Sequence, residues 1–256
     1  MSAVRVPPGY LRADLPHARI VVRAEVRAAI ETLLRTPGAP TLHEAAGRHP
    51  GAHAFHGRGV AWAIELPGGA GRAVVRHNRH GGLLAPLTGD RFLRPTRAPR
   101  ELATALRLAD AGIDTPEVLA IALYPAGLGV FARSDVATRE IEGAIDLGEL
   151  LLVSAPGDPR RPAALHATRA LLDSLARAGA RHHDLNVKNV LLAGDPATPR
   201  AVLLDVDRVT FRRPGSRGVL AGNATRLRRS LDKWTHVRGA TVTADDLRAL
   251  FGAATA

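Results

Sequence analysis

Three polar residues in the second half of the chain have the types and spacing that phosphoryl transfer requires. Asp184 follows two histidines, Asn189 comes five residues later, and Asp205 follows a further apolar stretch. In such a transfer one carboxylate orients the attacking hydroxyl, while an amide oxygen and a second carboxylate hold Mg²⁺. The spacing therefore predicts that Asp184 is catalytic and that Asn189 and Asp205 bind the metal ion.

Each of the three also has an ordinary structural interpretation. Asp184 suits the cap of a turn, and Asn189 suits the turn itself. Their joint occurrence ahead of an apolar strand favours a site instead. Asp205 ends the apolar run 202–204. A carboxylate buried there is costly without a partner, and a metal ion is a natural partner.

Two neighbouring residues belong to the same pattern. His182 stands two positions before Asp184, and we expect it to hydrogen-bond the backbone around the metal-binding loop rather than to transfer protons. Asp207 stands two positions after Asp205. It either brings a second carboxylate toward the metal or the acceptor, or pairs with Arg208, and the sequence leaves these alternatives open.

The charge of the chain favours an anionic partner. Its 35 Lys and Arg residues against 24 Asp and Glu residues give a net charge of +11. Two stretches account for this excess: 76–100 has six Arg and one Asp (+5), and 208–238 has nine basic residues and one Asp (+8). Such patches attract phosphates, nucleic acids or acidic membrane surfaces. A solvated arginine-rich surface is the alternative.

Composition excludes several other chemistries. The chain has no cysteine, which removes disulfides, Cys-ligated zinc and thiol catalysis. No apolar run reaches the length of a membrane span, and the first residues lack the apolar core of a signal peptide. We therefore expect any work at a membrane to be peripheral.

Hydrophobic spacing and turn residues predict a β-rich first half. Residues 1–16 are expected to be loosely ordered, and apolar residues at helical spacing predict a helix over 20–35. A Pro-Gly-Gly turn predicts a hairpin of the strands 59–66 and 71–76. A helix over 98–111 and strands over 117–124 and 128–136 complete this half.

The second half reads as mostly helical, with helices near 147–152, 161–178, 223–235 and 244–252 and short strands at 190–193 and 201–206. Thr243 and Asp246 form a capping-box-like start of the last helix. We therefore expect an α+β, protein-kinase-like bilobal fold. A β-rich N-terminal lobe over 1–139 would cover the nucleotide. A mostly helical C-terminal lobe over 140–256 would carry the catalytic and metal-binding loops.

Motifs spread over about 56–235 make the chain resemble the lipopolysaccharide kinase family, in particular the kinases of 3-deoxy-D-manno-octulosonic acid (Kdo). The motifs that carry the resemblance lie at 57–59, 74–82, 89–93, 100–102, 184–189, 204–208 and 223–233. The resemblance implies ATP- and Mg²⁺-dependent phosphorylation of a Kdo hydroxyl on Kdo–lipid A, in lipopolysaccharide core biosynthesis. It also implies a peripheral protein at the cytoplasmic face of the bacterial inner membrane, on an anionic surface.

The cation that would clamp the ATP phosphates departs from the usual pattern of kinases. No lysine precedes Lys188, so the usual lysine of a first-lobe strand is missing. Arg76, at the end of the strand, stands in its place, and its expected partner is Glu101 on the following helix. Arg binds phosphate in a bidentate manner, with a different reach from Lys. A surface arginine at a strand end is the alternative.

Two further groups are weaker candidates. Gly57 and Gly59 suit a loop that covers phosphates, because glycine lets backbone N–H groups approach oxygens, but they equally suit a hairpin turn. Arginines before the Glu101 helix are candidates for binding acceptor phosphate or carboxylate, or are solvated loop charges; they are Arg91, Arg94, Arg97 and Arg100.

Three rival functions remain. Another kinase-like phosphotransferase, acting on aminoglycosides or other sugars, would share the catalytic loop but would not need the basic stretch 76–100 or the motif 223–233. A non-catalytic kinase-like module would explain the missing lysine but not the intact Asp184, Asn189 and Asp205. A nucleic-acid binder would explain the charge, yet the chain lacks an aromatic stacking platform, and we expect no nucleic-acid partner.

Overall fold

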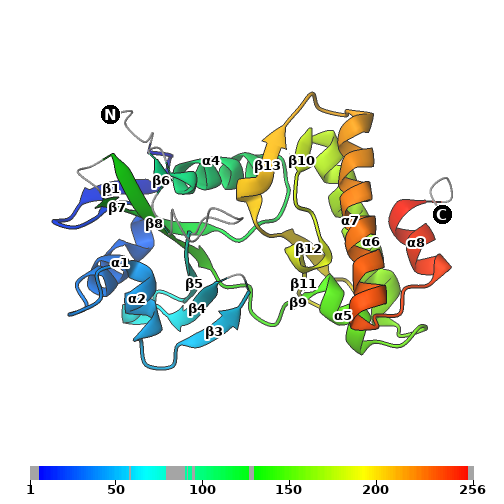
Figure 1. The fold of residues 1–256 in the computed structure, drawn as a ribbon, viewed down its shortest axis with the longest axis horizontal. Coiled ribbons are helices and arrows are strands. Elements are labelled where there is room, and N and C mark those ends of the chain that lie inside the picture. Colours follow the sequence, from blue (N-terminus) through cyan, green and yellow to red (C-terminus); the bar gives the residue numbers. More distant parts are fainter. Residues whose placement is uncertain are drawn as a thin grey trace. The chain divides into compact units, whose positions relative to one another are not determined.

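The computed structural model describes residues 6–57, 59–78, 90, 92–93, 96–126 and 130–252, which form an α+β fold (Figure 1). The chain divides into two compact units. The first comprises Met1–Ala103 and Glu117–Glu140, and the second comprises Thr104–Pro116 and Ile141–Ala256. By its contacts, Thr104–Pro116 therefore belongs to the second unit, although it precedes the expected boundary at 139/140 in the sequence.

An antiparallel sheet dominates the first unit. Its strands follow the order β1-β2-β7-β8-β5-β4-β3, and β6 pairs with β8. Successive neighbours along this order run antiparallel. The strands are β1 Tyr10–Asp14, β2 Arg19–Arg23, β3 His53–His56, β4 Val60–Glu65, β5 Arg72–His77, β6 Phe92–Leu93, β7 Val118–Ala126 and β8 Phe131–Arg139.

Two helices cover one face of this sheet, α1 (Arg27–Leu34) and α2 (Leu42–Gly47). Their apolar residues share a buried cluster with Ala73 and Val75 of β5. Because successive side chains of a strand point to opposite faces, Arg76 lies on the other face. The helix α4 (Arg97–Asp110) brings Glu101 to Arg76 on that face.

The expected helix over 20–35 is wrong in its first part. Residues Arg19–Arg23 form β2, which pairs with β1 on one side and β7 on the other, and α1 begins only at Arg27. Ile20, Val21 and Val22 are buried, and their branched side chains suit a sheet that is covered on both faces. Helical spacing of apolar residues cannot separate these two outcomes over so short a run.

The N-terminal expectation is likewise wrong for Tyr10–Asp14, which forms β1 rather than loose chain. The Tyr10 hydroxyl donates to the Val118 carbonyl at 2.6 Å and fixes this edge strand. The elements α2 and β3 were not expected from the sequence. In contrast, the hairpin of β4 and β5, the helix α4 and the strands β7 and β8 are confirmed.

The second unit is mostly helical. Its helices are α5 Leu147–Val153, α6 Arg160–Arg177, α7 Arg217–Arg238 and α8 Ala244–Phe251, so the expected helices are confirmed, with α7 longer than expected. The predicted capping box of Thr243 and Asp246 starts α8. None of the helices in the described ranges combines the length and the apolar character needed to cross a membrane.

Two small sheets of the second unit frame the segment that carries the polar pattern. One pairs β10 (Ala180–His182) with β13 (Val209–Phe211), and the other has the order β12-β11-β9. The strands of the latter are β9 Ile145–Asp146, β11 Val190–Ala193 and β12 Arg200–Leu203. Short 3-10 turns follow at η4 (Val187–Asn189) and η5 (Val206–Arg208).

A glycine of α5 sets how closely this segment packs. A Cβ atom on the buried Gly148 would lie 2.7 Å from Cγ2 of Val187 and 2.9 Å from the Trp234 ring. Real Cβ atoms essentially never come so close to a neighbour. The absence of a side chain at Gly148 therefore lets η4 and α7 meet on the α5 backbone.

We predict that Gly148→Ala lowers the free energy of unfolding by about 1–3 kcal/mol, because the added methyl overpacks this contact. The loss should occur although Ala favours a helix over Gly by about 1 kcal/mol. Urea unfolding measures it. The matched control is Gly218→Ala in α7, where the nearest neighbour of a Cβ is Ser216 Oγ at 3.6 Å. Equal stability of both variants would contradict this packing.

Candidate active site

His182 connects the two loops that carry the predicted site. Its side chain is completely buried, its Nε2 donates to the Leu204 carbonyl at 3.1 Å, and its Nδ1 accepts from the Asp184 N–H at 3.1 Å. Burial lowers the pKa of His182, which favours the neutral ring. A neutral imidazole has one donor and one acceptor, as these two bonds require. The predicted structural role of His182 is confirmed.

Asp184 and Asn189 are brought together by their own polar groups. The Asp184 carbonyl accepts from Asn186 Nδ2 at 2.9 Å and from Asn189 Nδ2 at 3.0 Å. The Asn189 carbonyl accepts from the Leu204 N–H at 2.9 Å. Since the Asn189 amide uses its nitrogen toward Asp184, its oxygen lies on the other side of the amide group.

Asp205 adopts a backbone conformation that is rare outside glycine. Its φ and ψ are 53° and 44°, and it is the one non-glycine residue with positive φ within the described ranges. Asp enters this left-handed region more easily than most residues, and such conformations gather at functional sites. The turn ends β12 at Leu203, so the strand predicted over 201–206 is too long by three residues.

Asp207 lies beside Arg208, with 3.8 Å between Asp207 Oδ2 and Arg208 Nε, and its side chain is 17% exposed. The pairing with Arg208, which the sequence offered as one alternative, is thus present. His183, between His182 and Asp184, is exposed, and its ring nitrogen Nε2 lies 2.7 Å from the Thr210 hydroxyl. It therefore lies outside the buried part of the loop that His182 occupies.

Arg226, for which the sequence predicted no role, contacts the predicted catalytic residue. Its Nη2 lies 2.8 Å from Asp184 Oδ1, and both side chains are more than one third exposed. Arg226 comes from α7, 42 residues after Asp184. It belongs to the motif 223–233, so the family resemblance was a signal for it, but no spacing rule connects it to Asp184.

Asn223 of the same motif fixes α7 against β10. Its side chain is completely buried. Its Oδ1 accepts from the His182 N–H and from Arg181 Nη1, each at 3.0 Å, and its Nδ2 donates to the Ala180 carbonyl at 2.9 Å. The backbone position of His182 is therefore set by a side chain of α7.

The first unit holds the other predicted residues. Arg76 of β5 forms an ion pair with Glu101 of α4, and the Glu101 residue is only 1% exposed. The expected pairing of these residues is therefore present, while their role toward a nucleotide is a separate question. Gly57 and Gly59 flank the turn between β3 and β4, where the Gly57 N–H donates to the Gly59 carbonyl at 3.1 Å.

Two of the remaining arginine candidates, Arg97 and Arg100, lie within the described residues. Arg97 lies with its Cζ 5.6 Å from the centre of the Phe92 ring, and Arg100 lies in the first turns of α4. Arg58, Arg91, Arg94 and the segment 79–89 lie outside the described residues.

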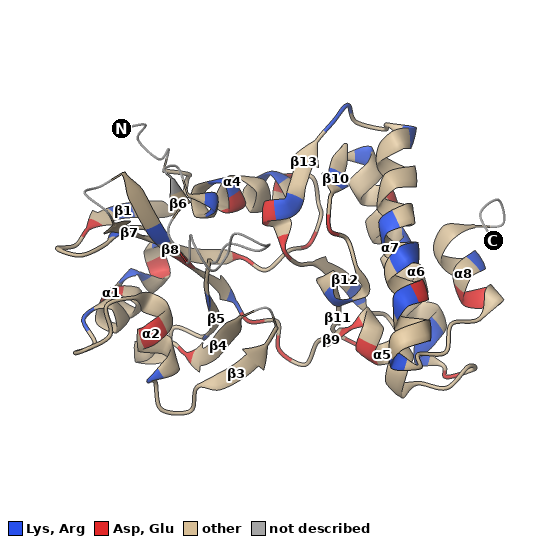
Figure 2. Cartoon of the chain, viewed as in Figure 1, with Lys and Arg blue, Asp and Glu red and all other residues tan. Residues whose placement is uncertain are grey.

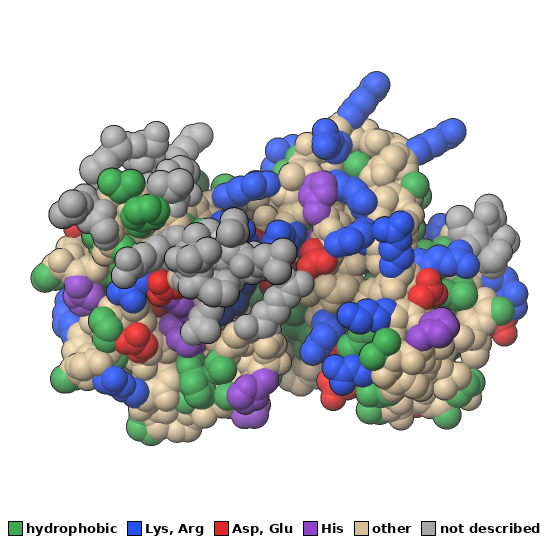
Figure 3. Space-filling model, viewed as in Figure 1, with side chains coloured by type: hydrophobic (Ala, Val, Ile, Leu, Met, Phe, Trp, Pro, Cys, Tyr) green, Lys and Arg blue, Asp and Glu red, His purple; other side chains and the backbone are tan. Residues whose placement is uncertain are grey.

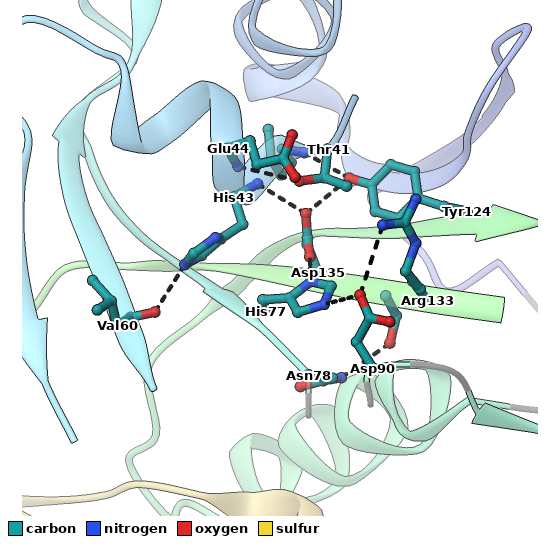
Figure 4. Close-up of polar contacts among 12 residues, drawn as sticks. Thr41, His43, Glu44, Val60, His77, Asn78, Asp90, Tyr124, Arg133 and Asp135 are labelled. Atoms are coloured by element: carbon teal, nitrogen blue, oxygen red, sulfur yellow. Dashed lines mark hydrogen bonds and ion pairs between the residues drawn. The ribbon is translucent and has the colours of Figure 1, made fainter. Parts of the chain in front are cut away.

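A buried polar network supports the strand that carries Arg76 (Figure 4). The Asp135 carboxylate of β8 is completely buried and lies 2.5 Å from Nδ1 of His77, the residue after Arg76. It also accepts from the Tyr124 hydroxyl at 2.9 Å and from the His43 N–H at 2.8 Å. The network thereby ties β5 and β7 to the start of α2.

His77 connects this network to Asp90, which belongs to the motif 89–93. Its Nε2 lies 3.0 Å from Asp90 Oδ2. Burial of the ring opposes protonation, but the hydrogen bonds and charges of Asp135 and Asp90 outweigh burial and raise the pKa of His77. His77 thus lies between two carboxylates, and its contact with Asp135 offsets part of the cost of burying that group.

The predicted residues thus form two sets. Asp184, Asn189 and Asp205 belong to one hydrogen-bonded arrangement in the second unit, to which Arg226 is added. Arg76 and Glu101 form the other set in the first unit.

We predict that His182→Ala lowers the free energy of unfolding by about 2–4 kcal/mol at neutral pH, because it removes a buried ring and leaves two partly buried polar backbone groups without their partner. The deficit should narrow as pH falls below about 6.5. There the unfolded wild type binds a proton that its folded state, with the lowered pKa, does not bind.

Denaturant unfolding of both proteins between about pH 5.5 and 8 checks this, with the exposed His166→Ala as the control. A deficit that widens toward low pH would mean that His182 is charged in the folded protein.

Comparisons with known proteins place this geometry in a family. The model of the lipopolysaccharide kinase (Kdo/WaaP) family matches residues 53–251. A 3-deoxy-D-manno-octulosonic acid kinase of Stenotrophomonas maltophilia (strain K279a) is 34% identical over 181 residues, 69% of this chain and 68% of that relative. The protein of the same name from Xanthomonas axonopodis pv. citri (strain 306) is 33% identical over the same shares.

A solved structure shares the fold. It is described as WaaP in complex with acyl carrier protein, with a TM-score of 0.53, 18% identity and coverage of 86% of each chain. At this identity the likeness concerns the kinase-like fold alone. The match to the family model spans most of the chain and therefore shows the family as well as the fold. The chain belongs to the lipopolysaccharide kinase (Kdo/WaaP) family and is a phosphotransferase.

Proposed function

We propose that this protein transfers the γ-phosphoryl group of ATP to a hydroxyl of Kdo on Kdo–lipid A, in the synthesis of the lipopolysaccharide core. The observation that carries the proposal is the fixed position of Asp184, whose backbone N–H and carbonyl are both hydrogen-bonded by side chains of the same segment. The choice of acceptor is supported by the names of the relatives.

Asp184 would orient the acceptor hydroxyl and accept its proton. The carboxylate is 38% exposed, so an acceptor from solution can reach it. Its backbone is held from both sides, by His182 at the N–H and by Asn186 and Asn189 at the carbonyl. A backbone held in this way limits where the carboxylate can lie, which is what positioning catalysis needs.

Asn189 and Asp205 would hold Mg²⁺ together with the phosphates of ATP. Their donor set fits this ion, because Mg²⁺ is usually bound through one or two protein oxygens plus substrate phosphates. Within the described ranges, no group of three His, Cys, Asp or Glu residues is arranged to hold a metal ion without such phosphates. When bound, the ion would neutralise charge that develops on the transferred phosphoryl group.

Arg76 would contact the phosphates of ATP, and Glu101 would fix its direction. The support is their ion pair on the face of β5 that is opposite to α1 and α2. The turn with Gly57 and Gly59 would cover the phosphates. Among the described residues, the neighbour that a Cβ atom on Gly57 would meet is the Gly59 carbonyl at 3.8 Å, an ordinary van der Waals contact.

We further propose that the protein works at the cytoplasmic face of the bacterial inner membrane as a peripheral protein. The support is the lipid nature of the acceptor and the distribution of charge. Figure 3 shows Lys and Arg side chains gathered on the visible face of the second unit, and Figure 2 shows basic residues along α7. Such surfaces are attracted to anionic lipids.

The test is to incubate the purified protein with labelled ATP and Kdo–lipid A and to identify the product by mass. We predict one added phosphate on the Kdo part. Asp184→Asn should lower kcat by about 100- to 10,000-fold, as expected for the loss of a positioned base. Asp232→Asn removes an exposed carboxylate of α7 and is the control. Transfer to an aminoglycoside instead of Kdo–lipid A would replace the proposed acceptor.

We predict that Arg76→Gln and Glu101→Gln each lower kcat/KM for ATP by about 10-fold or more, the effect of losing a charge-assisted phosphate contact. The double variant should be little worse than either single variant, because removing one partner already disables the other.

The control for this cycle is Arg72→Gln, on the same strand and paired with Glu140 at 2.8 Å. Losses that multiply would mean that Arg76 and Glu101 do not act as a pair. A loss in the control alone would move the phosphate contact to Arg72.

A further inference from the structure

A second guanidinium lies next to the arginine that contacts Asp184. Arg181 of β10 donates through Nη1 to Asn223 Oδ1 at 3.0 Å, and Arg226 donates through Nη2 to Asp184 Oδ1 at 2.8 Å. The two arginines are close enough for the charge of one to act on the other. They therefore form a pair of cations beside the candidate catalytic carboxylate.

Gly222 of α7 makes this approach possible. A Cβ atom on Gly222 would lie 2.3 Å from Cζ, 2.6 Å from Nη2 and 2.7 Å from Nε of Arg181, so the guanidinium rests against the helix backbone. Arg226 follows Gly222 by four residues and so lies on the same face of the helix. Long side chains on a helix lean toward its N-terminus, which directs Arg226 toward the turn where Arg181 rests.

The pair has an excess of positive charge. Within the described part of the chain, the one hydrogen bond of the Arg181 guanidinium goes to the neutral amide of Asn223. Burial, and then the charge of Arg226, lower the pKa of Arg181, so both features of its surroundings oppose the cation. Within the described part of the chain, the carboxylate that contacts one of the two guanidiniums is that of Asp184, which pairs with Arg226. An anion bound between the two arginines would supply further opposite charge.

We propose that Arg181 and Arg226 bind the carboxylate of the sugar-acid acceptor. The proposal rests on the proposed function, because an octulosonic acid carries its carboxylate and its hydroxyls on one small sugar. An arginine has five N–H donors, so the bond of Arg226 Nη2 to Asp184 leaves other donors that can reach a second carboxylate. Arg226 would then hold the base and the acceptor together, and Arg181 would select an acidic sugar over a neutral one.

The test combines changes in the protein with a change in the acceptor. Steady-state kinetics are measured for wild type, Arg181→Gln and Gly222→Ala, with Kdo–lipid A and with its Kdo methyl ester. Arg181→Gln should raise KM for Kdo–lipid A by about 10- to 100-fold, the effect of losing a hydrogen bond to a charged group. KM for ATP should stay within about twofold, since the nucleotide does not use this contact.

The kinetics with the methyl ester decide whether the arginine binds the carboxylate. The ester should raise KM for the acceptor in wild type as much as Arg181→Gln does, and it should add little in the Arg181→Gln protein, because both changes remove the same contact. Losses that multiply would overturn the proposal, since the arginine would then bind another part of the acceptor, such as a phosphate of lipid A.

Two further variants protect the test against a failure to fold. Gly222→Ala keeps both arginines and suits a helix, yet its methyl must displace the Arg181 guanidinium, so it should also raise KM for the acceptor. Arg238→Gln removes a charge from α7 twelve residues beyond Arg226, about 18 Å along the axis, and should leave KM unchanged.

The outcomes separate the two proposals. A wild type that does not phosphorylate Kdo–lipid A removes the proposed function and this acceptor with it. An active wild type whose KM for the acceptor is unchanged in Arg181→Gln and Gly222→Ala overturns the carboxylate site alone. A rise in KM for ATP in place of the acceptor would assign the pair to the nucleotide phosphates and would likewise overturn it.

Discussion

The arrangement of the second unit depends on one neutral imidazole. His182 donates to the carbonyl that precedes Asp205 and accepts from the N–H of Asp184, so a single ring sets the distance between the two loops. This works only while the ring has one donor and one acceptor. Burial lowers the pKa of His182 and so maintains that state. The backbone of His182 is itself held, because its N–H donates to Asn223 Oδ1.

The first unit solves a similar positioning problem with charge instead of neutrality. Asp135 is completely buried and accepts hydrogen bonds from groups on three elements, β5, β7 and α2. A buried carboxylate is stable only with such partners, so their positions are coupled. His77, which follows Arg76 in β5, is one of them. The hydrogen bonds of Asp135 thereby hold β5, the strand that carries Arg76, through the neighbouring residue His77.

The acceptor site that we propose at the two arginines near Asp184 would adapt a shared fold to one acceptor. The kinase-like fold is common to this chain and to a WaaP structure at 18% identity, so the fold alone does not decide which hydroxyl is phosphorylated. In our proposal, side chains on α7 and β10 recognise the acceptor. Gly222 contributes to this site, because its missing side chain lets a guanidinium rest on the helix beside Arg226.

Local sequence patterns predicted the elements whose neighbours are close in sequence. The hairpin of β4 and β5, the helices α4 to α8 and the capping box of α8 depend on turn residues, periodicity and caps within a few positions. The strand β2 was not predicted by these local patterns. Ile20–Val22 carry the same apolar residues that a helix would bury, and only β1 and β7, the latter about a hundred residues away, make them a strand.

The same division holds for the candidate site. The residue types and spacing of Asp184, Asn189 and Asp205 were sufficient to name them, because phosphoryl transfer restricts which groups can serve and in which order. The sequence also paired Arg76 with Glu101. It did not reveal Arg226, Arg181 or the left-handed turn at Asp205. The contacts of the two arginines join segments about forty residues apart, and those around Asp205 join segments about twenty residues apart. Tertiary packing decides which side chains meet there.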